Sequence, residues 1–288
     1  MKTVDLHTHS NASDGSCSPK DVVRLAVEAG LSAVALTDHD DTGGVEEAVE
    51  EGKRQQAEGR NIEVIPGIEI SAGYKNTDIH ILGLFIDPLE ETFVRETKEA
   101  VKRREQRNIQ MVENLSRAGV EITMEDLMEE NPDTVITRAH FARHLLKKGY
   151  VKTMGAAFTK YLNPDGPYYV PRVYISKSRA IELIRLAGGV PVLAHPLHYK
   201  LPQKELEQLV RELTEQGLAG IEAKYSNHFA ADEAVVRALA AKNGLLLSGG
   251  SDFHGANKPD IHIGTGRGNL QVPYEYVEKM KEWRAANL

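Results

Sequence analysis

The hydrophobic and polar positions of the chain repeat one unit, which consists of a capped helix, a glycine and a short apolar strand. In the first copy, Ser18-Pro19-Lys20-Asp21 is typical of a helix start with a capping box. Gly30 ends this helix before an apolar run over residues 31–36. Further copies are expected over residues 180–194, 204–223 and 231–247. Alternation of helices and strands in this way predicts a parallel sheet.

Histidines and carboxylates lie within or directly after the apolar runs. They occur in His7-Thr8-His9 with Asp14 behind it, Thr37-Asp38-His39, Gly67-Ile68-Glu69, Ile79-His80-Ile81, Ala194-His195-Pro196 and Ser251-Asp252-Phe253-His254. Alternate residues of a strand share a face, so His7 and His9 can bind one ion. Ligands on so many strands favour a barrel, because an open doubly wound sheet concentrates its site at one switch point.

These candidate ligands all donate nitrogen or oxygen, which suits Mn²⁺, Fe²⁺ or Zn²⁺ and disfavours a cysteine-rich structural zinc site. They extend from His7 to His254, so they cannot form a local zinc finger. A single histidine of this kind is often a hydrogen-bonded core residue. The recurrence of six histidines and three carboxylates nevertheless predicts a multinuclear metal site.

Residues 88–172 interrupt the repeat. Apolar positions from Phe93 to Leu115 predict a long helix, shorter helices are expected farther on, and residues 163–171 are typical of a loop. We expect a helical insertion domain over the mouth of a barrel that is formed by residues 1–87 and 173–288. The alternative is that these helices belong to the outer layer of the barrel itself.

Composition limits the class of protein. The 288 residues are 41% hydrophobic and 27% charged, as in soluble globular proteins, and no apolar run approaches the roughly 20 residues that cross a bilayer. No signal peptide is expected, since the first strand begins almost at Met1. Cys17 is the only cysteine, so no internal disulfide can form and a cytoplasmic location is expected. The net charge of −7 argues against long duplex nucleic acid but permits a small anionic substrate or the end of a short oligonucleotide.

The motifs together closely resemble those of the PHP (polymerase and histidinol phosphatase) family of metal-dependent phosphoesterases, which are relatives of the amidohydrolases. The resemblance runs from His7 to His254 outside the insertion, and no expected ligand is missing. It implies an α/β fold, a distorted (β/α)₇ barrel, with up to three metal ions.

The resemblance also implies how the ions are bound. A first ion would take His7, His9, Glu69 and Asp252, a second would take Glu69 as a bridge with His80 and His195, and a third would take Asp14, His39 and His254. Two to three divalent ions are expected, with Mn²⁺ favoured over Fe²⁺ or Zn²⁺. A water or hydroxide bridging the first two ions would be the nucleophile. The expected catalytic residues are therefore Glu69, Asp252 and His195.

Within the family, the chain is most similar to stand-alone nucleotide phosphatases that act on 3′,5′-bisphosphates and to related exonucleases on short RNA. The likeness lies in Thr137-Arg138-Ala139-His140-Phe141-Ala142-Arg143, although similar members tend to have Pro in place of Ala139. Arg138 and Arg143 near a helix N-terminus predict an anion clamp, and His140 could contact substrate. The alternative is a threonine-capped helix with solvated arginines.

Other substrate contacts are expected around the barrel. The candidate phosphate ligands are Arg172 and Lys177, the candidate pocket residue is Tyr225, and the candidate proton donors to a leaving group are His198 and His228. His144 and His262 are expected to be ordinary surface or packing residues. No general acid follows from the sequence.

We therefore expect a metal-dependent phosphoesterase that hydrolyses a phosphomonoester of a nucleotide, with a 3′,5′-bisphosphate as the leading substrate. Histidinol phosphate and short RNA attacked from its 5′ end are the alternative substrates. A non-catalytic metal-binding PHP module is the alternative of another class, and the complete set of ligands disfavours it. The sequence does not indicate an oligomeric state.

Overall fold

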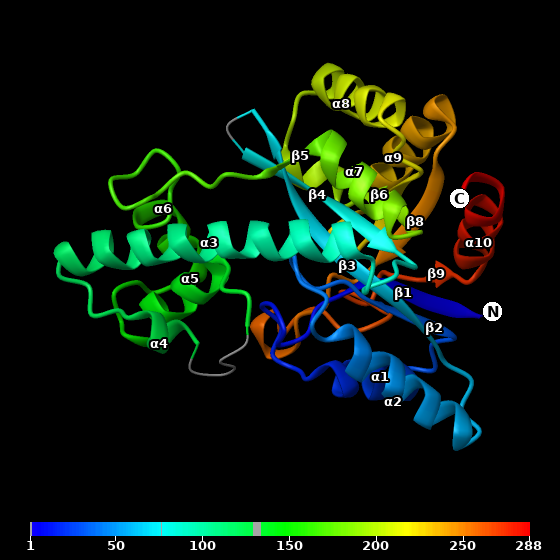
Figure 1. Ribbon diagram of the computed structural model, residues 1–288, viewed down its shortest axis with the longest axis horizontal. Coiled ribbons are helices and arrows are strands. Elements are labelled where there is room, and N and C mark those ends of the chain that lie inside the picture. Colours follow the sequence, from blue (N-terminus) through cyan, green and yellow to red (C-terminus); the bar gives the residue numbers. More distant parts are fainter. Residues whose placement is uncertain (1, 76, 129–133) are drawn as a thin grey trace.

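The computed structural model describes residues 2–75, 77–128 and 134–288. A barrel-like sheet covered by helices forms one part of the molecule, and further helices extend to one side of it (Figure 1). Both ends of the chain lie on the barrel, on the side away from this extension. Within the described residues, no helix is both long enough and apolar enough to cross a membrane.

The sheet is nearly closed. Its barrel strands are β1 (Thr3–Thr8), β2 (Ala33–Leu36), β3 (Glu63–Tyr74), β4 (Thr77–Leu84), β6 (Val190–Leu193), β7 (Gly220–Tyr225) and β8 (Leu246–Gly250), in the spatial order β8-β7-β6-β4-β3-β2-β1. The ends of this order meet just beyond β8, where the amide of Asp252 donates to the carbonyl of His7 at 2.8 Å. Two short strands, β5 (Ile175–Ser176) and β9 (Val272–Pro273), pair with β3 and β1. The predicted α/β barrel is confirmed.

The sheet is mixed, so the prediction of a parallel sheet is wrong in this respect. β4 is antiparallel to both of its neighbours, β3 and β6, and β9 is antiparallel to β1. Only two residues separate β3 from β4, too few for the crossover that joins parallel strands, so the two strands form a hairpin. The register of this hairpin pairs Ser71 with His80, which brings His80 next to Glu69.

Helices cover the outside of the barrel. They are α1 (Pro19–Glu28), α2 (Val45–Ala57), α7 (Lys177–Leu186), α8 (Gln203–Glu215), α9 (Ala230–Asn243) and α10 (Glu275–Asn287). Ser18 caps α1 by accepting from the amide of Asp21, and Gly30 follows that helix with a φ of 72°, both as predicted. The sequence did not predict α2, whose first residue follows Gly44 with no side-chain cap.

The apolar core explains why Glu69 points inward. Ile68 and Ile70 of β3 pack in one buried cluster with Ile181 and Ile184 of α7, on the outside of the sheet. Since neighbouring residues of a strand face opposite sides, Glu69 between them faces the barrel interior. A second buried cluster, formed by other strand residues, packs against α10.

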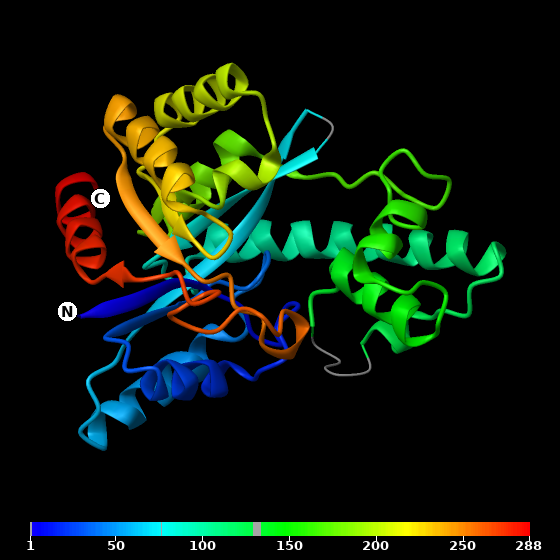
Figure 2. The same cartoon turned by 180° about the vertical axis from the view of Figure 1, so that it is seen from behind.

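In the described residues the helical extension has four helices, and Figure 2 shows it from behind. They are α3 (Glu91–Arg117), α4 (Met124–Leu127), α5 (Arg138–Lys147) and α6 (Met154–Lys160). Met111, Leu115, Phe141 and Leu145 belong to an apolar core of this extension. The start of α3 instead packs on the barrel, because Phe93 lies in the cluster that contains α7. Division of the chain at residues 88 and 172 stays a prediction.

Candidate metal centre and phosphate pocket

Nine histidines and carboxylates meet at one end of the barrel, and they are the nine predicted metal ligands. β1 and the loop after it supply His7, His9 and Asp14, the end of β2 supplies His39, the β3–β4 hairpin supplies Glu69 and His80, and the segments after β6 and β8 supply His195, Asp252 and His254. The most exposed of them is His80, with 21% of its side chain accessible. The structure thus brings these distant positions together.

Glu69 lies at the centre of this ligand cluster. Its Oε2 atom is 3.3 Å from Nε2 of His7 and 3.2 Å from Nε2 of His9. Its Oε1 atom is 2.8 Å from Nδ1 of His80 and 3.1 Å from Nε2 of His195. Burial favours the neutral acid, but the surrounding histidines hold the pKa of Glu69 well below its usual range. Glu69 is thus an anion whose two oxygens reach different rings, as a bridging ligand requires.

The other two carboxylate ligands, those of Asp252 and Asp14, contact histidines on opposite sides of the cluster. Asp252 Oδ1 lies 3.4 Å from Nε2 of His9 and 3.7 Å from Nε2 of His7. Asp14 Oδ1 lies 3.1 Å from Nε2 of His254 and 4.0 Å from Nδ1 of His9. His9 therefore offers one ring nitrogen to each side.

Ligand atoms within 4.8 Å of one another form three groups, which are His7, His9 and Glu69, then His39, Glu69 and His80, and finally His9, Asp14, His39 and His254. The predicted sets are similar but not identical. Asp252 is absent from the first group, His39 takes the place of the expected His195 in the second, and His9 joins the third. Because His9, His39 and Glu69 are each shared, the three groups form one continuous cluster.

The donors fit divalent metal ions. In the described part of the chain, buried atoms without a hydrogen-bond partner include Nδ1 of His9, His39 and His195, Oε2 of Glu69 and Oδ1 of Asp14. Buried polar atoms are normally satisfied, so this concentration needs a partner of its own. Divalent cations accept imidazole and carboxylate lone pairs of this kind.

A second set of residues orients the ligands, and the sequence analysis missed most of it. Glu222 of β7 lies with Oε1 3.1 Å from Nδ1 of His7, and its Oε2 accepts from the backbone amide of His195 at 2.7 Å. Tyr225 and Lys258 donate to Asp252 Oδ2 at 2.8 and 2.7 Å. Such partners fix ligand orientation. The available signal was Glu222, a lone carboxylate inside an apolar strand.

The backbone is strained at the site. His195, Asp252 and Asp40 have φ values of 28°, 57° and 55°, in the left-handed region that non-glycine residues rarely adopt. Conformations of this kind persist where the surrounding structure imposes them, and they concentrate at functional sites.

A cavity of about 170 Å³ opens beside the cluster, lined by His39 and His80 on one side and by four arginines on the other. We call it the arginine pocket, after Arg104, Arg107, Arg138 and Arg172. Arg104 and Arg107 come from α3 and were not predicted as site residues. Their signal was a pair of arginines three apart on the predicted long helix.

Three of the pocket's arginines are paired with two carboxylates, Asp40, which does not line the cavity itself, and Asp78, which does. Asp40 accepts from Arg172 at 2.8 Å and is also paired with Arg104. Although burial opposes ionisation, these two arginines lower the pKa of Asp40 to about 2. Asp78 Oδ1 lies 3.9 Å from Nη2 of Arg138. Asp14 also lines the pocket, so four guanidinium groups are matched by three carboxylates, those of Asp14, Asp40 and Asp78, and an excess of positive charge remains.

Arg107 is the arginine of this pocket with no carboxylate partner among the described residues, and its Nη1 donates to Met111 Sδ at 2.8 Å. Burial and the neighbouring Arg104 lower the pKa of Arg107 to about 10, which leaves it charged at neutral pH. The Nε donors of Arg104, Arg107 and Arg172 are buried without a partner in the part of the chain that the structure describes. The pocket is therefore prepared for an anion.

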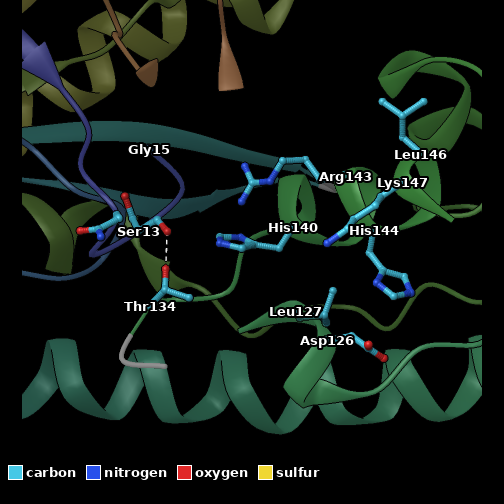
Figure 3. A pocket seen from close by; sticks show the side chains of 11 residues that line it. Ser13, Gly15, Asp126, Leu127, Thr134, His140, Arg143, His144, Leu146 and Lys147 are labelled. Carbon is cyan, nitrogen blue, oxygen red and sulfur yellow. Dashed lines mark hydrogen bonds between the residues drawn. The ribbon is translucent and has the colours of Figure 1, made fainter. Parts of the chain in front are cut away.

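The predicted clamp of Arg138 with Arg143 is not what the structure contains. Arg138 lines the arginine pocket, but Arg143 lines a different cavity, which it shares with His140 and the loop around Ser13 (Figure 3). Five residues apart on α5, the two side chains leave the helix in different directions. Thr137 caps this helix as expected, with His140 accepting from its amide at 3.0 Å. Burial lowers the pKa of His140 to about 4, so it is neutral.

The remaining predicted substrate contacts form two groups, namely residues that line a cavity at the metal-ligand cluster and residues that do not. His198 and Tyr225 line a cavity of about 330 Å³ on the metal-ligand cluster, with the His198 ring 5.5 Å from that of His195. His228 instead packs against the Tyr225 ring and donates to the carbonyl of Ala223. Lys177 is ion-paired with Glu212 of α8 and lines neither this cavity nor the arginine pocket. The structure thus does not bring Lys177 or His228 to the site.

The structure also places the two histidines that were expected to be ordinary surface or packing residues. His144 donates to the carbonyl of Glu121 at 2.7 Å within the extension, and His262 is exposed on a loop after β8. Neither takes part in the metal-ligand cluster.

Comparisons with known proteins agree with this geometry. The sequence profile of the PHP domain matches residues 5–225. A 3′,5′-nucleoside bisphosphate phosphatase of Chromobacterium violaceum is 36% identical over 266 residues, which cover 92% of this chain and 91% of the relative. The 5′-3′ exoribonuclease Rnm of Escherichia coli is 36% identical over 250 residues, which cover 87% of this chain and 84% of the relative.

Among solved structures, that of a candidate metal-dependent phosphoesterase from Bifidobacterium adolescentis superposes with a TM-score of 0.83 at 29% identity. The match covers 97% of this chain and 95% of that one. The likeness therefore includes the helical extension as well as the barrel.

Proposed function

The chain belongs to the PHP domain family and is a metal-dependent phosphoesterase, and from this premise we propose that it removes the 3′-phosphate from a nucleoside 3′,5′-bisphosphate. The observation that carries the proposal is the arginine pocket beside the metal-ligand cluster. A substrate with two phosphates can place one at the cluster and the other among the arginines. The relative from C. violaceum, named for this activity, supports the same substrate class.

The nine clustered residues, His7, His9, Asp14, His39, Glu69, His80, His195, Asp252 and His254, would hold the metal ions. We propose two to three ions, with Mn²⁺ favoured because imidazole and carboxylate donors suit it. When bound, the ions supply positive charge at the phosphoryl group and lower the pKa of water so that it can act as the nucleophile.

The other residues position the substrate. Asp40 holds Arg104 and Arg172 in place, so their donors are oriented before the 5′-phosphate arrives. Bidentate contacts from guanidinium groups suit a phosphate. Phe158, with 37% of its surface exposed, lines the same pocket and offers a face on which a base can stack.

Histidinol phosphate fits this pocket poorly. Apart from its phosphate, histidinol is a cation through its ammonium group, and the excess positive charge of the arginine pocket would repel it. A short RNA with a 5′-phosphate is the second candidate, because it presents the same two phosphates, and the E. coli relative is named for an activity of this kind.

Since these relatives are enzymes, the alternative of a non-catalytic module is set aside. A cytoplasmic location remains our proposal, which the single cysteine supports.

A panel of substrates tests the function. Phosphate release in the presence of Mn²⁺ would be measured for adenosine 3′,5′-bisphosphate, adenosine 3′-monophosphate and histidinol phosphate. We expect the highest kcat/KM for the bisphosphate. Equal or better turnover of histidinol phosphate would refute the proposed substrate class.

The third ligand group gives a separate prediction. Asp14 is in that group alone, and Thr137 Oγ1 donates to its Oδ2 at 3.0 Å. Asp14→Asn keeps this hydrogen bond acceptor but weakens the ligand, so bound metal should fall by about one equivalent while the other groups remain filled. Elemental analysis of the purified variant measures this, and either complete metal loss or none would contradict a three-ion centre.

A further inference from the structure

The metal-ligand cluster borders two cavities. His39 and His80 line the arginine pocket and also the cavity of about 330 Å³ that contains His198 and Tyr225. We call the second cavity the downstream pocket, and its other wall is made by Asn227, Lys258, Pro259, Asp260, Ile261 and Arg267. Its volume is at the lower end of the roughly 300–1,000 Å³ typical of ligand pockets. The hydrolysis of a bisphosphate bound in the arginine pocket does not use this space.

The wall of the downstream pocket is held rigidly. The loop that carries Arg267 is anchored to the barrel, since the amide of Gly264 donates to the buried carboxylate of Asp5 at 2.7 Å. Asn269 of the same loop donates to the carbonyls of Ser226 and His228 at 3.2 and 3.1 Å. These bonds tie the loop to the segment after β7 and fix the shape of the pocket.

The loop that carries Arg267 also approaches the segment after β7 closely, which further fixes the wall of the pocket. A Cβ atom on Gly266, where φ is 57°, would lie 2.6 Å from Oγ of Ser226. No larger residue fits there without moving the loop. Arg267 and Asn227, the neighbours of these two residues, are thereby held opposite each other.

Arg267 offers a positive charge to a phosphate ester in this pocket. Nε of Arg267 donates to Asn227 Oδ1 at 2.9 Å, which orients the guanidinium group. Its Nη1 is 3.5 Å from Oδ2 of Asp260, a carboxylate with 80% of its side chain exposed, and an ion pair this exposed is weak. An incoming phosphate can therefore compete for Arg267.

The chemistry of the proposed reaction explains the need for space here. In a 3′,5′-bisphosphate, water adds to the 3′-phosphorus, the P–O3′ bond breaks and O3′ takes up a proton. In a 5′-phosphorylated dinucleotide held by the same 5′-phosphate, the same P–O3′ bond breaks with the same balance of atoms. The second nucleoside stays on the phosphate that is released, so it must lie beyond the cluster, away from the arginine pocket.

We propose that the downstream pocket binds the second nucleotide of a short 5′-phosphorylated oligonucleotide, with Arg267 as the residue that determines specificity for such substrates. The inference rests on the proposed function, because it takes the 5′-phosphate to lie in the arginine pocket. One active site then serves both the bisphosphate and the oligonucleotide.

The test compares two substrates, adenosine 3′,5′-bisphosphate and the 5′-phosphorylated trinucleotide pApApA, whose second internucleotide phosphate would lie in the downstream pocket, in the native protein, Arg267→Ala and Arg267→Lys. A charged hydrogen bond at a half-exposed site should contribute about tenfold. We expect Arg267→Ala to lower the ratio of kcat/KM for cleavage of the first bond of pApApA to kcat/KM for the bisphosphate by about this factor, with partial recovery in Arg267→Lys. Arg211→Ala, an exposed residue of α8, is the matched control and should leave the ratio unchanged.

Each of the other possible results would contradict the inference, and each for a different reason. If the native protein hydrolyses the bisphosphate but not pApApA, the downstream pocket does not bind a nucleotide and the proposed function stands. If Arg267→Ala lowers both activities equally, Arg267 is not specific for the second nucleotide. If neither substrate is hydrolysed while another phosphomonoester is, the proposed function fails and the inference fails with it.

Discussion

Glu69→Gln is expected to fold like the native chain and to lose phosphoesterase activity almost completely. Glu69 contacts rings on both sides of the cluster, and it is shared by two of the three ligand groups. Glutamine keeps the shape but supplies a neutral, weaker ligand, so two metal positions are affected by one change. The loss should exceed the roughly 10²–10³-fold that removal of a single stabilising group costs. Steady-state kinetics with excess Mn²⁺ and circular dichroism of the metal-free protein measure the two parts of this prediction.

Glu222→Gln is the matched control, because Glu222 is equally buried but is not a predicted metal ligand. It contacts Nδ1 of His7 and the backbone amide of His195 and so only supports these two ligands. Loss of such a supporting contact typically costs 10–100-fold, so its activity should fall between that of the native protein and that of Glu69→Gln. Near-native activity of Glu69→Gln with its metals still bound would remove Glu69 from the centre of the site.

Arg107→Ala should lower kcat/KM for a 3′,5′-bisphosphate by one to two orders of magnitude and leave a 3′-monophosphate nearly unaffected. A hydrogen bond to a charged group contributes about 1.5–3 kcal/mol, which corresponds to that range. Arg107 is a cleaner choice than Arg104 or Arg172, whose removal would also disturb the buried carboxylate of Asp40. The monophosphate has no 5′-phosphate and cannot use the arginine pocket.

Arg95→Ala on the same helix is the control for a lost charge, since 67% of the Arg95 side chain is exposed far along α3 from the pocket. It should change neither activity. Equal losses on both substrates in Arg107→Ala would indicate general damage, and the arginine pocket would then not be the site of the 5′-phosphate.

The candidate metal ligands could be identified from the sequence because each stands in a recognisable local motif, either within a strand, as Glu69 and His80 do, or shortly after one. Convergence of strand ends at one face of a barrel is a property of the fold class, so local motifs were sufficient. Even so, the motifs alone did not predict that β4 runs antiparallel. The two-residue connection before Thr77 contained that information, since it excludes a crossover.

The arginine pocket could not be predicted in the same way. Arg104 and Arg107 lie on a long helix outside the barrel motif, and their role depends on how α3 packs across the mouth of the barrel. Nothing within a few residues of them indicates Asp40 as a partner. Arg143, by contrast, looked functional because it stands near a capped helix start, but the helical rotation between it and Arg138 turns it into the neighbouring cavity.

The left-handed backbone at Asp40, His195 and Asp252 implies a conflict between durability and activity in this enzyme. Glycine adopts such angles without steric cost, so a selection for heat resistance alone would favour glycine at His195 and Asp252, whereas at Asp40 it would leave Arg104 and Arg172 buried without their carboxylate. Each such change would remove a carboxylate or imidazole that the site needs. Thermostable variants should therefore be sought elsewhere in the barrel, and any glycine recovered at these positions should mark a protein that is more robust and inactive.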